Sequence, residues 1–562
     1  MNKTSKKYFS KTNRITELTF VSRKFYKDPL SEIELNCIFY DPDGIKRIVP
    51  GFWDGDDIWR IRYSSDIKGQ HKFKTECSNK MDAGLHNIEG SVEVEEYSGN
   101  NNIFLSGRLC VSADKRHLEH VNGKPFLWLG DTWWFALTNR LKWPEDFKYL
   151  TNDRVNKGFT VIQLVAGFIP ETPFFDPGNK NDGGYAWDED YKSVNPNFFS
   201  MADLRINWLI ENGLIPCIVG SWGYFLPLLG IEKMKRHWRY LVARWGAYPV
   251  IWCVAGEAKM PHYSEFKAST EENKDLDISR KQKEGWSQIA RYIRSIDCYN
   301  NLITVHPSPG DNSFSSRDIF EDDSLFDIDM LQTGHFDKTS FKDHLETVEK
   351  SINAKPSKPV VIGEVDYEGI GGGSWQDTQR FLYWTSMLSG CAGYTYGAQG
   401  VWNANGDIEF KGGSANWGDY IWKDAMNFPG SYQLGLGKKL LEKYDYLKLE
   451  VHPEWVEPHR NNSNRISPYC AGIPGKLRII YFPSYHLLNN ISDFPFKKVK
   501  VLNIEKSTNY KAFYFNIRNG EKVWEIDTVS PNDKGEWIIE GRNGPISTNP
   551  SLEDWVLVLE SK

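Results

Sequence analysis

Val250-Ile251-Trp252-Cys253-Val254-Ala255-Gly256-Glu257-Ala258 is an almost unbroken apolar run of strand length that ends in one carboxylate. A strand that is apolar on both faces is what a parallel sheet covered by helices requires. A second segment, Pro359-Val360-Val361-Ile362-Gly363-Glu364-Val365, repeats this plan and also delivers a Gly-Glu pair. In a barrel of such strands, the C-terminal end of each strand faces the mouth of the barrel. We therefore expect Glu257 and Glu364 to share one face of a barrel.

The segments around these two runs repeat the same alternation of buried strand and amphipathic helix. Helices are expected from Pro144 to Gly158, from a Ser200–Asp203 cap to Gly213, near 232–246, around 286–296 and near 433–447. Eight strand segments can be counted, at 126–134, 160–165, 214–219, 250–258, 302–306, 326–332, 359–365 and 393–397. Eight such units predict an α/β protein with a (β/α)8 TIM barrel.

The two ends of the chain have a different pattern, with short alternating strands separated by turns such as Asp41-Pro42-Asp43-Gly44. This spacing is typical of β-sandwiches. We therefore predict three domains: an N-terminal β-sandwich at 1–100, the catalytic barrel at 101–450 and a C-terminal β-sandwich at 451–562. The long segment 167–199, rich in Gly, Pro, Asp and aromatic residues, is expected to form a functional rim of the barrel.

The composition of the 562-residue chain excludes several partners. Lys and Arg number 68 against 74 Asp and Glu, which gives a net charge of −6. No basic surplus is left to neutralise a phosphate backbone, so no nucleic-acid partner is expected. No apolar run is long enough to span a membrane, and no signal peptide is seen, so a cytoplasmic enzyme is expected, or a secreted one if the chain was trimmed. The eight cysteines are expected to be reduced thiols, and no pattern indicates an oligomeric state.

Two carboxylates on one barrel face suggest hydrolysis of a glycosidic bond. A retaining glycosidase needs one carboxylic acid to protonate the leaving oxygen and one carboxylate to attack the anomeric carbon, about 5–5.5 Å apart. Glu257 is the expected acid/base and Glu364 the expected nucleophile. Two alternatives stay open: an inverting glycosidase of the apiosidase type, with carboxyl groups about 6.5–9.5 Å apart, and a non-catalytic carbohydrate-binding protein on a barrel scaffold.

Other polar and aromatic residues at strand ends are candidates for binding the carbohydrate substrate. An indole can stack on the apolar face of a sugar, and a carboxylate, amide or imidazole can bond its hydroxyls. The candidates are Asp131, Trp133, Trp134, Gln163, Trp222, His306, His335 and Trp402.

Signals for a metal or a cofactor are missing, so neither is expected. His117-Leu118-Glu119-His120 has the wrong spacing for the H-E-x-x-H zinc motif. No G-x-S-x-G nucleophile elbow occurs. Gly369-Ile370-Gly371-Gly372-Gly373-Ser374 lacks the last glycine of a dinucleotide loop, and we interpret it as a rim loop beside Glu364.

Three stretches resemble a known family: Phe126–Trp134, Trp252–Glu257 and Val361–Glu364. They are similar to the apiosidase-like glycoside hydrolases, in the clan of (β/α)8 retaining glycosidases with catalytic carboxylates on strands four and seven. The resemblance covers about residues 105–450, and it implies Glu257 as acid/base and Glu364 as nucleophile. The segment Val49–Gly55 looks like part of the domain that often precedes such barrels, and the C-terminal sandwich looks like their usual companion.

The chain departs from the family pattern at two positions. Gly256 stands where many members of the clan have asparagine, and Glu257 stands where apiosidases proper have aspartate. The resemblance therefore implies the broad class of glycoside hydrolases and does not imply apiose as the sugar.

Overall fold

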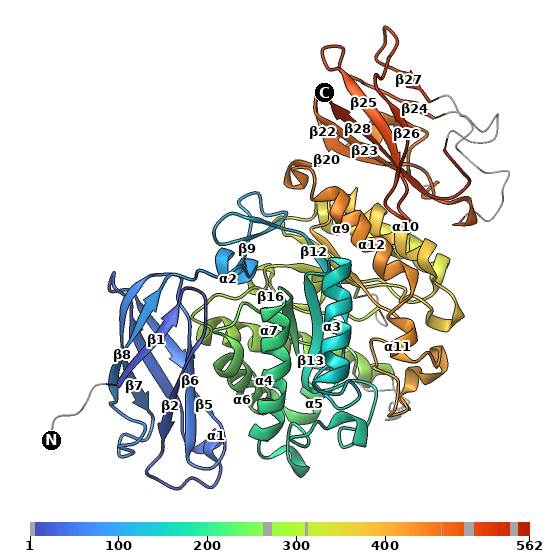
Figure 1. The fold of residues 1–562 in the computed structure, drawn as a ribbon. Coiled ribbons are helices and arrows are strands. Elements are labelled where there is room, and N and C mark those ends of the chain that lie inside the picture. The colour runs from blue at the N-terminus through green and yellow to red at the C-terminus, as the bar shows by residue number, and fades with distance from the viewer. Residues whose placement is uncertain (1–5, 262–271, 310–312, 462–463, 488–498, 540–548) are drawn as a thin grey trace.

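The structure is a computed structural model of the chain, and it describes residues 6–261, 272–309, 313–461, 464–487, 499–539 and 549–562. Three parts follow one another along the chain and in space (Figure 1). A strand-rich N-terminal part packs against one side of a central barrel wrapped by helices. A second strand-rich part projects from the opposite side of the barrel.

The N-terminal part consists of eight strands and one short helix: β1 (Lys6–Lys11), β2 (Thr16–Val21), α1 (Pro29–Glu32), β3 (Leu35–Tyr40), β4 (Lys46–Pro50), β5 (Phe52–Trp53), β6 (Ile58–Tyr63), β7 (Gly69–Cys77) and β8 (Glu89–Glu95). They form one sheet of order β1-β8-β7-β3-β4 and another of order β2-β6-β5. Along most of β7 the side chains alternate between buried and exposed, as expected for a strand with one face on a core. Leu18, Phe39 and Phe73 meet in that core, which confirms the predicted sandwich.

A short connection leads into the barrel. It contains α2 (Asn102–Ser106) and a small sheet of β9 (Leu109–Val111), β10 (Leu118–His120) and β11 (Pro125–Phe126). β10 and β11 pair antiparallel across a turn in which Gly123 has a φ of +82°, a left-handed conformation that favours glycine.

Eight parallel strands form the barrel: β12 (Trp128–Thr132), β13 (Val161–Phe168), β14 (Ile215–Ser221), β15 (Ile251–Cys253), β16 (Ile303–Thr304), β17 (Asp329–Gln332), β18 (Val360–Glu364) and β19 (Gly393–Tyr396). Each lies within or overlaps a predicted segment. Every residue in them is buried, as apolar runs covered on both faces require. Seven parallel pairings join them in the order β16-β15-β14-β13-β12-β19-β18-β17.

The barrel closes between β16 and β17 through single hydrogen bonds. The backbone N–H of Asp327 donates to the carbonyl of Ile303 over 2.8 Å, and the hydroxyl of Thr304 donates to the carbonyl of Ile328 over 2.9 Å. The (β/α)8 prediction is therefore confirmed.

Helices cover the outside of the barrel: α3 (Glu145–Lys157), α4 (Pro196–Glu211), α5 (Phe225–Leu229), α6 (Ile231–Trp245), α7 (Glu272–Ile296), α8 (Ser316–Ile319), α9 (Ser340–Asn353), α10 (Gln376–Met387), α11 (Trp422–Ala425) and α12 (Pro429–Leu441). The predicted start of α4 is wrong. Asn195 caps this helix by accepting a hydrogen bond from the N–H of Asn197, and Pro196 occupies its first turn. Ser200 and Asp203 therefore lie inside the helix, and Asp203 binds Arg62 of the N-terminal part.

The C-terminal part again consists of two sheets. Its strands are β20 (Glu450–Val451), β21 (Val456–Glu457), β22 (Tyr469–Ile473), β23 (Leu477–Phe482), β24 (Lys500–Val501), β25 (Tyr510–Phe515), β26 (Lys522–Ile526), β27 (Trp537–Ile538) and β28 (Trp555–Ser561). The first sheet has the order β20-β22-β23-β28-β25-β26, and the second has the order β21-β24-β27. Ile480, Val501 and Leu557 are among the residues of the core between the two sheets.

Buried charge pairs fasten both outer parts to the barrel. Asp203 of α4 accepts hydrogen bonds from Arg62 of β6 over 2.6 and 2.9 Å, and Arg244 of α6 binds the same carboxylate. On the other side, Arg380 of α10 donates to both oxygens of Asp554 over 2.7 and 2.9 Å. A buried charge that loses its partner is uncompensated, so each of these contacts disfavours separation of the outer part from the barrel.

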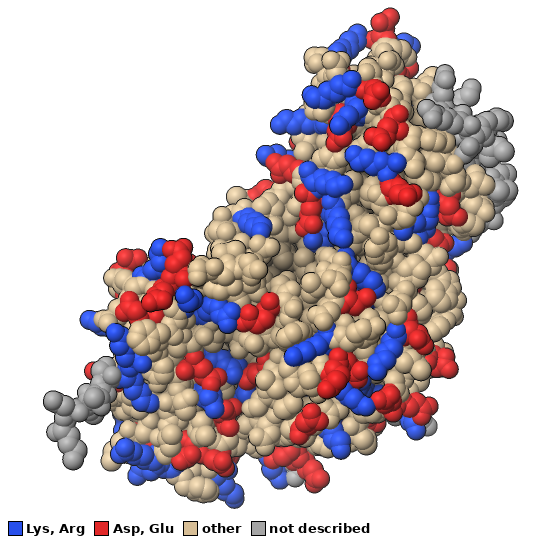
Figure 2. All heavy atoms as spheres, viewed as in Figure 1, with Lys and Arg blue, Asp and Glu red and all other residues tan. Residues whose placement is uncertain are grey.

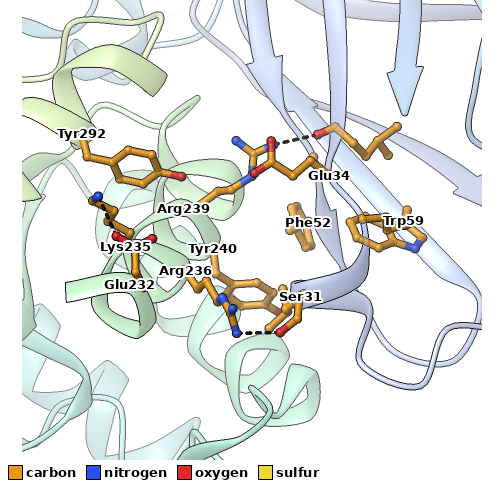
Figure 3. A pocket seen from close by; sticks show the side chains of 14 residues that line it. Ser31, Glu34, Phe52, Trp59, Glu232, Lys235, Arg236, Arg239, Tyr240 and Tyr292 are labelled. Carbon is orange, nitrogen blue, oxygen red and sulfur yellow. Dashed lines mark hydrogen bonds and ion pairs between the residues drawn. The ribbon is translucent and has the colours of Figure 1, made fainter. Parts of the chain in front are cut away.

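A pocket of about 320 Å³ opens beside the N-terminal contact (Figure 3). Arg236 of α6 reaches Ser31 across it over 2.7 Å, and Arg239 lies 3.6 Å from Glu34. Arg236 and Arg239 thus join the barrel to the sandwich, whereas Lys235 pairs with Glu232 of its own helix.

The surface carries both signs of charge. Figure 2 shows lysine and arginine interspersed with aspartate and glutamate over the face that it presents, without a region of one sign. Within the described ranges, every helix is too short or too polar to cross a membrane.

Candidate active site

Glu257 follows β15 in an unusual backbone conformation. Its φ is +40°, a left-handed value that costs a residue other than glycine about 1–3 kcal/mol and is often found at functional sites. The preceding residue, Gly256, forms an isolated parallel bridge with Trp222 after β14. This geometry turns the glutamate out of the strand, and its side chain is partly exposed.

Gly256 is required by the position of Trp222. A Cβ atom on Gly256 would lie 2.2 Å from the indole ring of Trp222, far inside contact distance. The indole nitrogen of Trp222 donates to Oε2 of Glu257 over 3.3 Å. The tryptophan thus occupies the space in which an asparagine at position 256 would begin, so the departure from the family pattern has a steric cause.

Glu364, the last residue of β18, lies between two histidines. Nε2 of His335 is 2.6 Å from its Oε1, and Nε2 of His306 is 3.2 Å from its Oε2. Burial by itself raises the pKa of Glu364, but the hydrogen bonds and charges of the two histidines outweigh it and hold the pKa well below its usual range. In return, although burial lowers the pKa of His306 and His335, Glu364 raises both above the ordinary histidine value. Glu364 is therefore held ionised.

Gln332, the last residue of β17, brings the two glutamates together. Its amide nitrogen donates to Oε1 of Glu257 over 2.9 Å and to Oε1 of Glu364 over 3.1 Å. Because both oxygens contact one nitrogen, they lie within about 6 Å of each other. Gln332 was not among the predicted site residues, although its place at the end of the sixth strand could have indicated it.

The pKa of Glu257 is shifted in the opposite direction from that of Glu364. Burial and the negative charge of Glu364 raise it above the usual glutamate value, against the hydrogen bond from Gln332 and the nearby histidines. The pair thus contains one carboxylate held ionised and one whose protonated form is favoured, which is how an acid and a base are distinguished in an active site.

Glu171 is a third carboxylate in this electrostatic environment, and it was not among the predicted residues. It lies in the predicted rim segment 167–199 with a φ of +65°, and it accepts hydrogen bonds from the hydroxyl and the N–H of Ser414 over 2.7 and 3.1 Å. Burial raises its pKa to about 7, and the negative charges of Glu257 and Glu364 contribute to the shift. No local sequence pattern marks this glutamate, because only the folding of the rim segment brings it near the pair.

Aromatic rings surround the carboxylates. Trp134 packs edge-on against Trp222 at 5.4 Å between ring centroids and against His306 at 5.5 Å. On the other side, His335 lies between the rings of Tyr367 at 4.7 Å and Trp417 at 5.8 Å. Trp417 is 40% exposed, so its indole is available for stacking against a sugar.

Of the predicted substrate-binding residues, Trp134, Trp222, His306 and His335 belong to this cluster, and Asp131 and Trp133 do not. Asp131 is fully buried and accepts hydrogen bonds from Arg154 of α3 over 2.6 Å and from the indole of Trp133 over 2.7 Å. Side chains alternate along a strand, and Asp131 points to the helix layer outside the barrel. The expectation that Asp131 and Trp133 face the substrate is therefore wrong.

Gln163 and Trp402 lie near the cluster but have structural partners. Gln163 is fully buried and donates to the carbonyl of Gly363 over 2.8 Å, directly before Glu364. Trp402 is 3% exposed and donates to Gln399 over 3.0 Å. Both support the site from within the protein. In the part of the chain that the structure describes, no group of three or more His, Cys, Asp or Glu side chains has the geometry to hold a metal ion.

Comparison with known sequences identifies the central part of the chain. The sequence model of the apiosidase-like catalytic domain matches residues 112–448, which is more than half of the chain. The chain belongs to the apiosidase-like family. It is thus a glycosidase, and the predicted relationship is confirmed. A domain of unknown function, DUF5060, matches residues 11–78 in the N-terminal sandwich. No curated protein matches the chain.

Solved structures share the fold of this apiosidase-like protein at low sequence identity. A putative glycoside hydrolase from Bacteroides vulgatus is 14% identical and superposes with a TM-score of 0.68, over 99% of this chain and 100% of its own. A glycoside hydrolase family 5 protein from the same species is 21% identical, with a TM-score of 0.63 over 81% of this chain and 94% of its own. A further glycoside hydrolase is 22% identical, with a TM-score of 0.62 over 81% and 97%. These likenesses support the barrel architecture.

Proposed function

We propose that this apiosidase-like protein hydrolyses a glycosidic bond in a polysaccharide or oligosaccharide with retention of configuration, with Glu364 as nucleophile and Glu257 as acid/base. The observation that carries the proposal is the shared contact with Gln332, which keeps one oxygen of each carboxylate within about 6 Å. Retaining enzymes have carboxyl separations of about 5–5.5 Å, and inverting enzymes need about 6.5–9.5 Å to admit a water molecule. A contact of both carboxylates with one amide nitrogen fits the shorter, retaining spacing.

The opposite pKa shifts support the two roles. Glu364, ionised between His306 and His335, attacks the anomeric carbon while the bond from that carbon to the leaving oxygen breaks. Glu257, with its raised pKa, gives its proton to the leaving oxygen. Glu257 then takes a proton from water, the water oxygen attacks the anomeric carbon, and the bond to Glu364 breaks. The sugar product has the configuration of the substrate, and both glutamates return to their first state.

Glu171 and Trp417 are candidates for holding the sugar. A carboxylate held by Ser414 can accept hydrogen bonds from sugar hydroxyls, and an exposed indole can cover the apolar face of the ring. Trp134 and Trp222 line one side of Glu257, where the indole of Trp222 donates to its carboxylate.

The test begins with a panel of aryl glycosides that differ in sugar and anomeric configuration. For each substrate that is hydrolysed, proton NMR recorded within the first minutes identifies the anomer released before it equilibrates. We expect the anomer of the substrate. Release of the opposite anomer would establish the inverting alternative, and glycan binding without turnover of any glycoside would establish the non-catalytic alternative.

The nucleophile is tested separately. A 2-deoxy-2-fluoro derivative of the hydrolysed sugar with a dinitrophenyl leaving group is used: the fluorine slows both steps, and the good leaving group keeps the first step faster than the second, so the covalent intermediate accumulates. Peptide mass spectrometry is expected to find the sugar on the peptide that contains Glu364, and a label on another peptide would reassign the nucleophile.

A further inference from the structure

A second concave site lies in the C-terminal sandwich and is lined by residues between Tyr514 and Ile539. Its volume is about 640 Å³, within the range of about 300–1,000 Å³ that is usual for ligand sites. β26 forms one wall and is the last strand of the six-stranded sheet, and β27 forms the other wall and is the last strand of the three-stranded sheet. Ser530, Pro531 and Asn532, which precede the turn at 533–534, also line the hollow. We name this hollow the edge trough.

A β-bulge shapes one wall of the edge trough. Ala512 pairs with Ile526 and Tyr514 pairs with Val523, so two residues of β26, Trp524 and Glu525, lie opposite the single residue Phe513. At this bulge Trp524 has a φ of +49°, a conformation that is uncommon for a bulky residue. Bulges re-aim side chains, and here the bulge places the partly exposed indole in the lining, edge-on to Tyr514 at 5.7 Å.

The opposite wall supplies a second indole and an apolar side chain. Trp537 is partly exposed, and its neighbour Ile538 is 49% exposed. Trp524 and Trp537 both line the hollow and are both partly exposed, and an indole can stack on another ring.

Polar groups are fixed at the end of the edge trough. The side-chain amide of Asn532 donates to Oε2 of Glu536 over 3.0 Å, and its Oδ1 accepts from the N–H groups of Lys534 and Glu536 over 2.9 and 3.0 Å. This arrangement holds the Glu536 carboxylate in one orientation beside the indoles. A carboxylate and an amide next to aromatic rings can bond the hydroxyls of a ring whose flat face is stacked.

We propose that the edge trough binds a neutral glycan chain, separately from the catalytic site. Among the described residues, Glu536 is the one charged side chain in its lining, so a neutral sugar is favoured over a uronic acid. Arg380 and Asp554 join the C-terminal sandwich to the barrel, so a glycan bound in the trough is tethered to the same molecule as the active site.

The experiment measures retardation of the full chain in native gels that contain a neutral polysaccharide, galactomannan or arabinoxylan, or the acidic polygalacturonate. All proteins carry Glu364→Gln so that the polymer is not degraded, and unchanged polymer viscosity verifies this. We expect retardation by at least one neutral polymer, weakened about tenfold or more in affinity by Trp537→Ala and less by Glu536→Gln. The matched control is Phe25→Ala, since Phe25 is a 90% exposed aromatic in the N-terminal sandwich, and it should leave retardation unchanged.

Two further measurements keep the outcome decisive. Trp537→Ala in the otherwise native chain should keep the thermal midpoint and the kcat/KM for a small aryl glycoside, which separates this site from the catalytic proposal. The proposal is overturned if no neutral polymer retards the parent, if Trp537→Ala and Phe25→Ala migrate alike, or if polygalacturonate alone retards it. Light scattering provides one more test. If Trp537→Ala changes the oligomeric mass of the protein but not its retardation, the trough is a contact between copies of the chain and the proposal is overturned.

Discussion

Two regions of this protein bury a carboxylate among cations, and they use it differently. Asp203, between the barrel and the N-terminal sandwich, is bound by Arg62, Arg244 and the indole of Trp245. Glu364, at the barrel mouth, is bound by two histidines and shares an amide with a second carboxylate. In both, burial raises the pKa and the cationic partners outweigh it, so both pKa values are held well below the usual range.

The partners explain the different uses. An arginine stays charged at all ordinary pH values, so the Asp203 cluster is fixed and serves as a structural joint. A histidine titrates near neutral pH, and a neighbouring carboxylate with a raised pKa can give and take a proton. A low carboxylate pKa alone therefore does not indicate an active site. The indication comes from the neighbouring Glu257, whose pKa is raised while that of Glu364 is lowered.

The first test of the difference between the Glu364 site and the Asp203 cluster is the substitution Glu364→Gln. The loss of the nucleophile is expected to lower kcat/KM by about 10⁴-fold or more. The thermal midpoint should stay within a few degrees of the parent, because a neutral amide keeps the shape of the side chain. Initial rates on the best aryl glycoside and a melting curve test both expectations, and a variant with more than a tenth of the parent rate would contradict the assigned role.

Asp203→Asn should show the reverse pattern. One partner removed from a buried ion cluster costs about 3–5 kcal/mol of unfolding free energy. Urea unfolding measures this loss, while kcat/KM per folded molecule should remain within about twofold of the parent, since no catalytic group is touched. Unchanged stability would show that Arg62 and Arg244 do not act as a joint.

The effect of Glu257→Gln on kcat/KM should depend on the leaving group of the substrate. Phenyl glycosides, whose leaving oxygen needs a proton, are expected to lose about 10²–10⁴-fold in kcat/KM, and dinitrophenyl glycosides much less. The slope of log(kcat/KM) against leaving-group pKa, compared between variant and parent, measures the effect. Equal losses on both classes would remove Glu257 from the role of acid.

Glu171→Gln should have a moderate effect. If Glu171 bonds a substrate hydroxyl, the kcat/KM falls about tenfold to a hundredfold and the stability changes little. The matched comparison is Glu409→Gln, which changes an exposed glutamate in the segment that follows β19 and should be neutral. Equal rates for the two variants would show that Glu171 does not contact the substrate.

His335→Asn should shift the pH profile. The hydrogen bond and charge of His335 lower the pKa of Glu364, so their loss raises that pKa toward the ordinary glutamate value of about 4.3. Ionised Glu364 is then lost at a higher pH, and the acid limb of kcat/KM moves upward by about one unit. The alkaline limb, which reports deprotonation of Glu257, should move less. An acid limb that stays in place would contradict the role of His335.

The sequence by itself determined the sandwich–barrel–sandwich architecture and the two glutamates at the ends of the fourth and seventh strands. Apolar runs of strand length indicate buried parallel strands, since a strand covered on both faces has apolar residues at nearly every position. The same local reasoning placed Trp134, Trp222, His306 and His335 at strand ends, where the structure has them.

Only the tertiary structure decided which polar side chains meet. Gln332 and Glu171 reach the site because closing the barrel brings strand six and the 167–199 rim together with strands four and seven. Asp131 lies outside the site because neighbouring residues of a strand point to opposite faces. Its side chain points to the face on which Arg154 binds it. Apolar periodicity is a local property of the chain, whereas the distance and charge between two carboxylates depend on contacts between segments far apart in it.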